Sequence, residues 1–331
     1  MYRSARRFIG SVPRFTAVVV AALSSAGAPA MAQKYPDRPV KIVAPFAPGG
    51  GVDLAARLVA EKLQPILGQP VIVENKPGAG AMIGAEAVAK AAPDGYTLLL
   101  TSNSLVNSPV LFGRAPFDWR KDFAFVSTIL TQPMALIAHP ALPAASVQEL
   151  IALAKKDGGK LSMATASAGS INHLAGELVL QSTGARWEMV HYKGSAPATA
   201  DLLGGQVQLQ FDQLAAALPH IRAGKVKALA VTSLSRAPSL PDVPTMDEAG
   251  LKGFEAITLF GLIAPARTPP EVVAALGAAM EKVLKDPAVV ERFAAMGSQA
   301  VYSTPEGLRD ALVKQAETWT TVIQRANIKL D

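Results

Sequence analysis

Glycine-rich and serine-rich turns after short apolar runs are the features of this sequence most suited to chemistry. The segments "PFAPGGGVD" (45–53) and "ATASAGSINH" (164–173) each lie between a predicted strand and a predicted helix. The first turn of a helix exposes N–H groups without helical partners, and the helix dipole places positive charge there. Such a turn binds an anion without a charged side chain. We therefore expect the two segments to hold a phosphate or a carboxylate.

Each of these features also has a purely structural interpretation. The glycines can serve only a tight strand-to-helix connection, with Ser167 or Ser170 capping the next helix. Asp53 lies in a first helical turn, where the dipole favours a carboxylate even without a ligand. The polar groups of "TSNSLVN" (101–107) and of Asp212, which ends "VQLQFD", suit either ligand contact or local capping. The sequence leaves both interpretations open.

The motifs of several enzyme classes are missing from the sequence. It has no cysteine, which excludes disulfides, thiolate nucleophiles and cysteine metal sites. Its histidines, at 139, 173, 191 and 220, lack metal-ligand spacing, and we expect His173 and His191 to pack or cap. "GAGAMIG" (78–84) approximates the dinucleotide-binding pattern, which keeps a nucleotide-using enzyme as an alternative. We predict a protein that is not an enzyme and that has no cofactor and no metal.

The first 32 residues have the order of a secretory signal peptide. A basic start is followed by the apolar "TAVVVAAL", and "AMA" before Gln33 fits a cleavage site after Ala32. The pair Arg6–Arg7 leaves twin-arginine export open, although we expect Sec-type export. Removing 1–32 lowers the basic residues from 32 to 28 against 26 acidic ones. The sequence therefore predicts an exported protein without a basic surface for nucleic acid.

Strand and helix signals alternate along the remaining chain, which predicts parallel α/β sheets with ligand sites at the carboxyl ends of strands. Two extended segments, 123–140 and 253–266, are long for ordinary strands and bracket a central block. We predict a first lobe from 33–133 plus 256–331 and a second lobe from 134–255. The two long segments would form a hinge, so that the lobes close on a ligand in a central cleft.

Several motifs occur together in a familiar order. They are "YPDRPVKIVAPFAPGGGVDLAARLVAEKL", "GQPVIVENKPGAGAMIGAEAVAKAAPDGYTLL", "SAGSINHLAGEL", "HYKGSAPATADLLGGQVQLQFD" and "GLIAPARTPPEVV". With them the whole mature chain closely resembles the Bug-type (TctC-like) receptors of tripartite tricarboxylate transporters. The resemblance implies a two-lobed periplasmic binding protein of type II-like fold that binds a small organic carboxylate. It also implies delivery to membrane transporter subunits, as a monomer. Presenting the ligand to a membrane sensor kinase is the alternative role.

The resemblance also implies which residues bind the ligand. They are Phe46, Ala47, Pro48, Gly49, Gly50 and Asp53 after the first strand, Thr101, Ser102 and Asn103 after the third, and Ser167, Ala168, Gly169, Ser170 and Asp212 in the second lobe. This chain departs from the family pattern at the glycine turn "GAGAMIG" (78–84), where a further glycine commonly follows, at Leu259–Phe260, where tryptophan is common, and in "TSNSLVNSP" (101–109). Which carboxylate is bound (an aromatic acid, a dicarboxylate or an amino acid) stays open.

Overall fold

The computed structural model describes Met1 and residues 35–46, 48–156, 160–192 and 194–330. Ala47 and, apart from Met1, the predicted signal peptide lie outside the described residues. The strands are β1 (Val40–Ala44), β2 (Val71–Asn75), β3 (Thr97–Ser102), β4 (Phe123–Ala138), β5 (Ser162–Thr165), β6 (Glu188–His191), β7 (Leu209–Gln213), β8 (Lys227–Val231), β9 (Ile257–Pro265) and β10 (Gln299–Ala300). The helices are α1 (Gly51–Leu67), η1 (Ala79–Ala81), α2 (Met82–Ala89), α3 (Ser104–Leu111), α4 (Val147–Lys156), α5 (Ile171–Thr183), α6 (Ser195–Leu203), α7 (Leu214–Arg222), α8 (Pro270–Lys285), α9 (Pro287–Ala295) and α10 (Pro305–Arg325).

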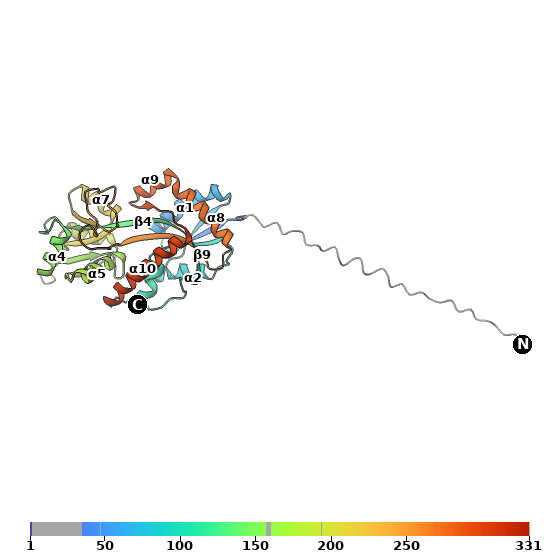
Figure 1. Cartoon of the computed structure of the whole chain (residues 1–331), viewed down its shortest axis with the longest axis horizontal. Coiled ribbons are helices and arrows are strands. Elements are labelled where there is room, and N and C mark those ends of the chain that lie inside the picture. Colours follow the sequence, from blue (N-terminus) through green and yellow to red (C-terminus); the bar gives the residue numbers. More distant parts are fainter. Residues whose placement is uncertain (2–34, 47, 157–159, 193, 331) are drawn as a thin grey trace.

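The chain forms two lobes, each built on a sheet (Figure 1). In the first lobe the strand order is β2–β1–β3–β9–β4, with β1, β2 and β3 parallel and β9 antiparallel to its neighbours. Successive strand residues point to opposite faces. Accordingly Ile42 and Leu98 pack in one apolar cluster, and Val43 and Leu99 pack in another. Helices therefore cover both faces of this sheet, as the alternating pattern predicts.

The second lobe has the strand order β4–β7–β5–β6, and β8 also pairs with β4. Strand β5 is parallel to β6 and β7, whereas β4 runs antiparallel to β7. Its two faces are also both covered, because Met134 and Leu136 belong to one apolar cluster and Ala135 and Ile137 to another. The carboxyl ends of β5 and β7 lead directly into the predicted ligand-binding residues of this lobe.

The two lobes share β4, which changes its partners in mid-strand. Pro133 is the last residue paired with β9, opposite Ile257, and Met134 is the first paired with β7, opposite Gln213. Proline has no N–H to donate to a ladder, so the point where partners change tolerates it. With β9 returning beside β4, the predicted two-lobed α/β fold with two crossing strands is confirmed. The numbered domain boundaries stay a prediction.

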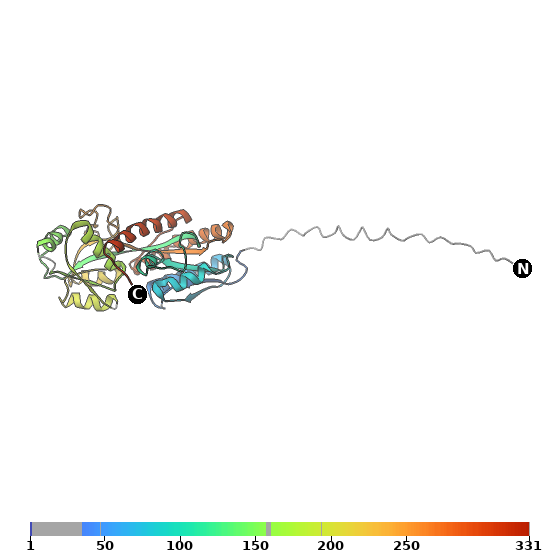
Figure 2. The ribbon, with the colours of Figure 1, turned by 90° about the horizontal axis from the view of Figure 1, so that it is seen from below.

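Two elements differ from the sequence interpretation. The segment 101–107, which the sequence presents as a polar turn, runs into helix α3 from Ser104 onward. Helix α10 also extends beyond the first lobe: Leu308 and Leu312 pack in a first-lobe cluster, whereas Trp319 and Val322 pack with Met134 and Leu136 in the second. Figure 2 shows α10 along one face of the molecule, reaching from one lobe towards the other. The lobes are therefore joined by a helix as well as by two strands.

Candidate functional site

The loop after β1 is held in place by the carboxylate of Asp53. Its Oδ2 accepts hydrogen bonds from the Gly49 N–H at 2.9 Å and from Arg57 Nε at 3.0 Å, and its Oδ1 accepts one from Asn75 Nδ2 at 2.9 Å. The hydrogen bond from Arg57, followed by those from Gly49 and Asn75, lowers the pKa of Asp53 to about 2. Because Asp53 is only 2% exposed, its role here is to brace the loop. Direct contact with a ligand stays a prediction.

The braced loop leaves the start of α1 open. Pro48, Gly49 and Gly50 are exposed, whereas Phe46 is half-buried against the first-lobe core. Gly50 is the N-cap residue and, as a glycine, has no side chain to cap the helix; its carbonyl accepts the N–H of Leu54 at 2.9 Å. The N–H groups of the first helical turn have no helical acceptor. The arrangement suits an anion at this helix start.

The residues at the end of β3 and directly after it are buried. Thr101, Ser102 and Asn103 are 1%, 6% and 5% exposed. Ser102 Oγ lies 2.8 Å from Ser104 Oγ, and Thr101 lines a small cavity together with Pro45 of the β1 loop. The structure thus brings the ends of β1 and β3 together, as parallel strands require.

Asn103 is the centre of a buried polar network that joins three elements. Its Oδ1 accepts the N–H of Leu259 at 2.7 Å, and its Nδ2 donates to the Ile257 carbonyl at 3.1 Å and to Gln315 Oε1 at 2.7 Å. Gln315 Oε1 also accepts from Trp319 Nε1 at 2.6 Å. The side-chain hydrogen bonds of Asn103 therefore go to the crossing strand β9 and to α10.

The small cavity beside Thr101 is also lined by Ala81 of the glycine turn 78–84. Ala79 and Ala81 have φ angles of +46° and +78° on either side of Gly80 at +61°. This left-handed conformation is costly for a residue with a Cβ atom. Glycine would adopt these angles at positions 79 and 81 without that cost.

In the second lobe, the turn after β5 is organised by the start of α5. Ser170 is the N-cap: its Oγ accepts the His173 N–H at 3.4 Å and donates to the Ser167 carbonyl at 2.7 Å. The Gly169 N–H donates to His173 Nδ1 at 3.0 Å. Ser167 is exposed, and Ala168, Gly169 and Ser170 are partly exposed. The capping interpretation of Ser170 is confirmed, and this lobe too presents a helix start.

Two histidine side chains, His173 and His191, lie next to this turn and contact each other. His173 is 5% exposed, and its ring centroid lies 4.5 Å from that of His191. His191 Nδ1 lies 2.7 Å from Thr165 Oγ1 at the end of β5. Burial, together with the neighbouring His173, lowers the pKa of His191. His173 packs and accepts a turn N–H, as the sequence analysis expects, whereas His191 is exposed at the end of β6 and contacts His173 and Thr165.

Asp212 is a fully buried carboxyl group at the carboxyl end of β7, with 0% of its surface exposed. Its Oδ1 accepts the Gln213 N–H at 2.9 Å, and its Oδ2 accepts from Thr199 Oγ1 of α6 at 3.3 Å. No cation pairs with it among the described residues. Burial therefore raises its pKa to about 6. No observation here tests whether Asp212 contacts a ligand, so that contact stays a prediction.

The second-lobe turn Ser167–Ser170 lies against the carboxyl end of α3, a first-lobe helix. A Cβ atom placed on Gly169 would lie 3.1 Å from the Leu111 side chain at the end of α3 and 3.2 Å from Leu330. The Leu330 N–H donates to the Leu111 carbonyl at 2.8 Å. The second-lobe turn thus lies beside the helix whose first turn follows Thr101–Asn103. That the β1 loop faces this turn across one cleft stays a prediction.

Three supporting residues were missed by the sequence analysis. Arg57 stands four residues after Asp53, a helical spacing that signals an ion pair. Asn75 ends β2, and it braces Asp53 and the Phe46 carbonyl across the parallel pair β1–β2. Gln315 had no signal, because it meets Asn103 from a position 212 residues further along the chain.

Among the residues that the structure describes, no group of three or more His, Cys, Asp or Glu side chains is placed to hold a metal ion. Within the same residues, no helix has the length and apolar character needed to cross a bilayer.

Two lobes joined by β4 and β9, with helix starts presented at strand ends, define a solute-binding protein of the periplasmic-binding-protein class. The family model described as "Tripartite tricarboxylate transporter family receptor" matches residues 55–328. The chain belongs to this family, and the resemblance noted from its motifs is confirmed. The Bordetella pertussis protein BugT is 40% identical over 324 residues, which cover 97% of this chain and 99% of BugT.

Solved structures show the same likeness. The periplasmic binding protein BugD is 40% identical, with a TM-score of 0.72 over 89% of this chain and 99% of BugD. An R. palustris protein solved with adipate is 33% identical, with a TM-score of 0.75 over 89% and 99% of the two chains. MatC from Rhodopseudomonas palustris, solved with bound malate, is 34% identical, with a TM-score of 0.71 over 87% and 100%. Proteins of this fold therefore include ones that hold small dicarboxylates.

Proposed function

We propose that this protein is a periplasmic receptor that binds a small organic carboxylate between its lobes and delivers it to a tripartite tricarboxylate transporter. The observation that carries the proposal is the open start of α1, where the loop is braced by Asp53 and the N-cap is Gly50, which has no side chain to accept the first N–H groups of the helix. Adipate and malate in related structures support a dicarboxylate as the ligand. The ligand is held and released without reaction.

Export and processing belong to the same proposal. The basic, apolar and small-residue order of residues 1–32 supports cleavage after Ala32 and release into the periplasm. N-terminal sequencing of the protein recovered from a periplasmic extract should begin at Gln33. A protein that begins at Met1 would contradict export with cleavage.

Calorimetric titration with adipate, malate and a panel of aromatic and amino acids tests the ligand class. We expect one of these compounds to bind at micromolar level or tighter, which corresponds to about −8 kcal/mol. If every carboxylate in the panel fails to bind, the proposed ligand class is wrong.

The variant Gly50→Val tests the place of binding. Gly50 has φ of −77° and ψ of 168°, which valine adopts without strain, so the fold should survive. The new side chain would cover the N–H groups at the start of α1, and we expect affinity to fall at least about 100-fold. Thermal unfolding of the free variant serves as the control. Unchanged affinity would show that the loop is only a connection.

A further inference from the structure

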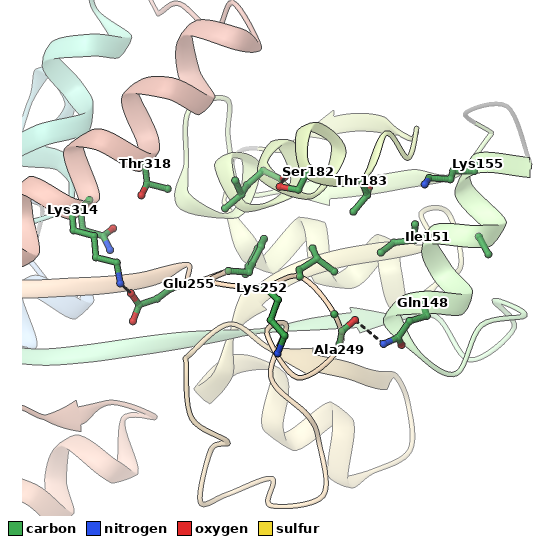
Figure 3. Close-up of a pocket in the computed structure, with 17 residues that line it drawn as sticks. Gln148, Ile151, Lys155, Ser182, Thr183, Ala249, Lys252, Glu255, Lys314 and Thr318 are labelled. Atoms are coloured by element: carbon green, nitrogen blue, oxygen red, sulfur yellow. Dashed lines mark hydrogen bonds and ion pairs between the residues drawn. The ribbon is translucent and has the colours of Figure 1, made fainter.

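A groove of about 740 Å³ lies between second-lobe elements and the middle of α10 (Figure 3). One wall is a stripe of α4 with helical spacing, Gln148, Ile151, Ala152 and Lys155. The other walls are the end of α5, the middle of α10 and the segment 249–255. The volume is in the range of sites for small organic molecules.

The floor of the groove is apolar. Leu251 and Phe254 are 8% and 4% exposed and belong to the second-lobe core, and the half-buried Leu178 and Ile151 pack against that core. An apolar body lying on these side chains would be removed from water at about 25 cal/mol per Å² of buried surface.

Most neutral polar groups of the groove are already engaged. Gln148 Nε2 donates to the Ala249 carbonyl at 2.7 Å, and Gln315 Oε1 accepts from Asn103 and Trp319. Ser182 and Thr183 donate their hydroxyl hydrogens to helix carbonyls at 2.6 and 2.7 Å. The bonds leave the Nε2 group of Gln315 and the Oε1 atom of Gln148 as neutral groups that a ligand could still contact.

Three lysines add charged donors to the groove and make it positive. Lys155, Lys252 and Lys314 line it together with one acid, Glu255. Lys314 pairs with Glu255 at 2.6 Å and Lys252 with Asp247 at 3.0 Å. An ammonium group has three N–H donors, so each pair leaves donors to spare. Figure 3 shows Lys155 extending from α4 towards Thr183 at the end of α5.

We propose that this groove is a second binding site, for an amphipathic anion with an apolar body and one carboxylate or sulfonate group. The apolar body would lie over Leu178, Leu251 and Phe254, and the anionic group would accept N–H donors from Lys155 or from the other lysines at the rim. The proposal does not depend on what the strand-end loops bind.

Fluorescence titration of the full chain with 8-anilinonaphthalene-1-sulfonate, an amphipathic anion, tests the site. We expect the wild-type protein to enhance the emission saturably, and Lys155→Glu and Ala152→Trp to weaken binding at least about 10-fold. Lys156→Glu is the matched control, because this neighbouring exposed lysine of α4 does not line the groove. It should bind like the wild type, and so should Gly50→Val, whose change lies at the strand-end loop.

Three results would each overturn the proposal. One is the absence of saturable binding to the wild-type protein. Another is equal weakening by Lys155→Glu and Lys156→Glu, which would indicate a general effect of charge. The third is binding that persists in Ala152→Trp but is lost in Gly50→Val, which would place the probe at the strand-end loops.

Discussion

At the scale of single residues, two buried carboxyl groups behave in opposite ways because their surroundings differ. Asp53 has Arg57 as a cationic partner, and its pKa is lowered to about 2. Asp212 is fully buried and has only neutral hydrogen-bond donors around it, so its pKa is raised to about 6. In the sequence both are only acidic residues near the end of a strand or the start of a helix, so the opposite directions of their pKa shifts follow from the fold.

Asp212 should make the protein less stable as the pH rises. Below its ordinary pKa of 3.8 the carboxyl is protonated in both states, and between 3.8 and about 6 only the folded protein keeps the proton. The free energy of unfolding therefore falls through this range, by an amount on the order of 3 kcal/mol. We expect Asp212→Asn to match the wild type near pH 4 and to be more stable at pH 8.

Urea denaturation of both proteins from pH 4 to 8 measures this difference. Asp242→Asn, at an exposed carboxyl group, is the matched control and should show a difference from the wild type that does not change with pH. A pH-independent difference for Asp212→Asn as well would contradict the assignment.

Asp53 should support both stability and binding. Replacing it with asparagine removes the ion pair with Arg57 and weakens the bond to Gly49, which should lower the free energy of unfolding by about 2 kcal/mol. Because the loop at α1 loses its brace, adipate or malate binding should weaken as well. Glu61→Gln, an exposed acid on the same helix, is the control. If Asp53→Asn retains full affinity in calorimetry, the brace is dispensable for binding.

At the scale of elements, Asn103 connects the predicted ligand-binding residues at the end of β3 to α10 and β9. The hydrogen bonds from Asn103 to Gln315 and from Trp319 to Gln315 are both between buried side chains. Leaving a buried donor without an acceptor costs about 1–3 kcal/mol. The network therefore ties the position of the β3–α3 loop to the helix that reaches the second-lobe core.

A double-mutant cycle measures the coupling free energy between Gln315 and Trp319 in this network. Gln315→Met should be destabilising by about 3 kcal/mol, because it orphans the donors of Asn103 and Trp319. Trp319→Phe removes one donor, so the double variant should lose less than the sum of the single losses. Gln324→Met, at an exposed site of α10, should be nearly neutral. Additive losses in chemical denaturation would argue against the shared acceptor.

At the scale of the whole molecule, the function proposed above requires the lobes to move. Strands β4 and β9 and helix α10 connect them, so closure must be accommodated at these crossings. Small-angle X-ray scattering with and without a carboxylate shown to bind should give a smaller radius of gyration for the complex. An unchanged radius at saturating ligand would contradict hinge closure.

The fold could be predicted to a large extent because its determinants are local. Short apolar runs such as Val40–Ala44, followed by turns and amphipathic helices such as α1, specify a βα alternation that has few packing solutions. The long segment Phe123–Ala138 indicated a strand shared by two lobes, because its length exceeds what one sheet uses. Helix α3 was missed because serine, asparagine and proline in 104–111 obscure its apolar stripe.

The order of most elements, the family and the glycine loop at α1 as an anion-binding candidate could all be inferred from the sequence. Which polar side chains remain available to a ligand depends on the packing of elements that lie far apart along the chain. Asp53, Asn103 and Asp212 turn inward and bond to Asn75, Gln315 and Thr199, and these partners lie on other elements of the fold. The physical reason is that a buried polar group needs a partner, and its partner is chosen by packing and not by distance along the chain.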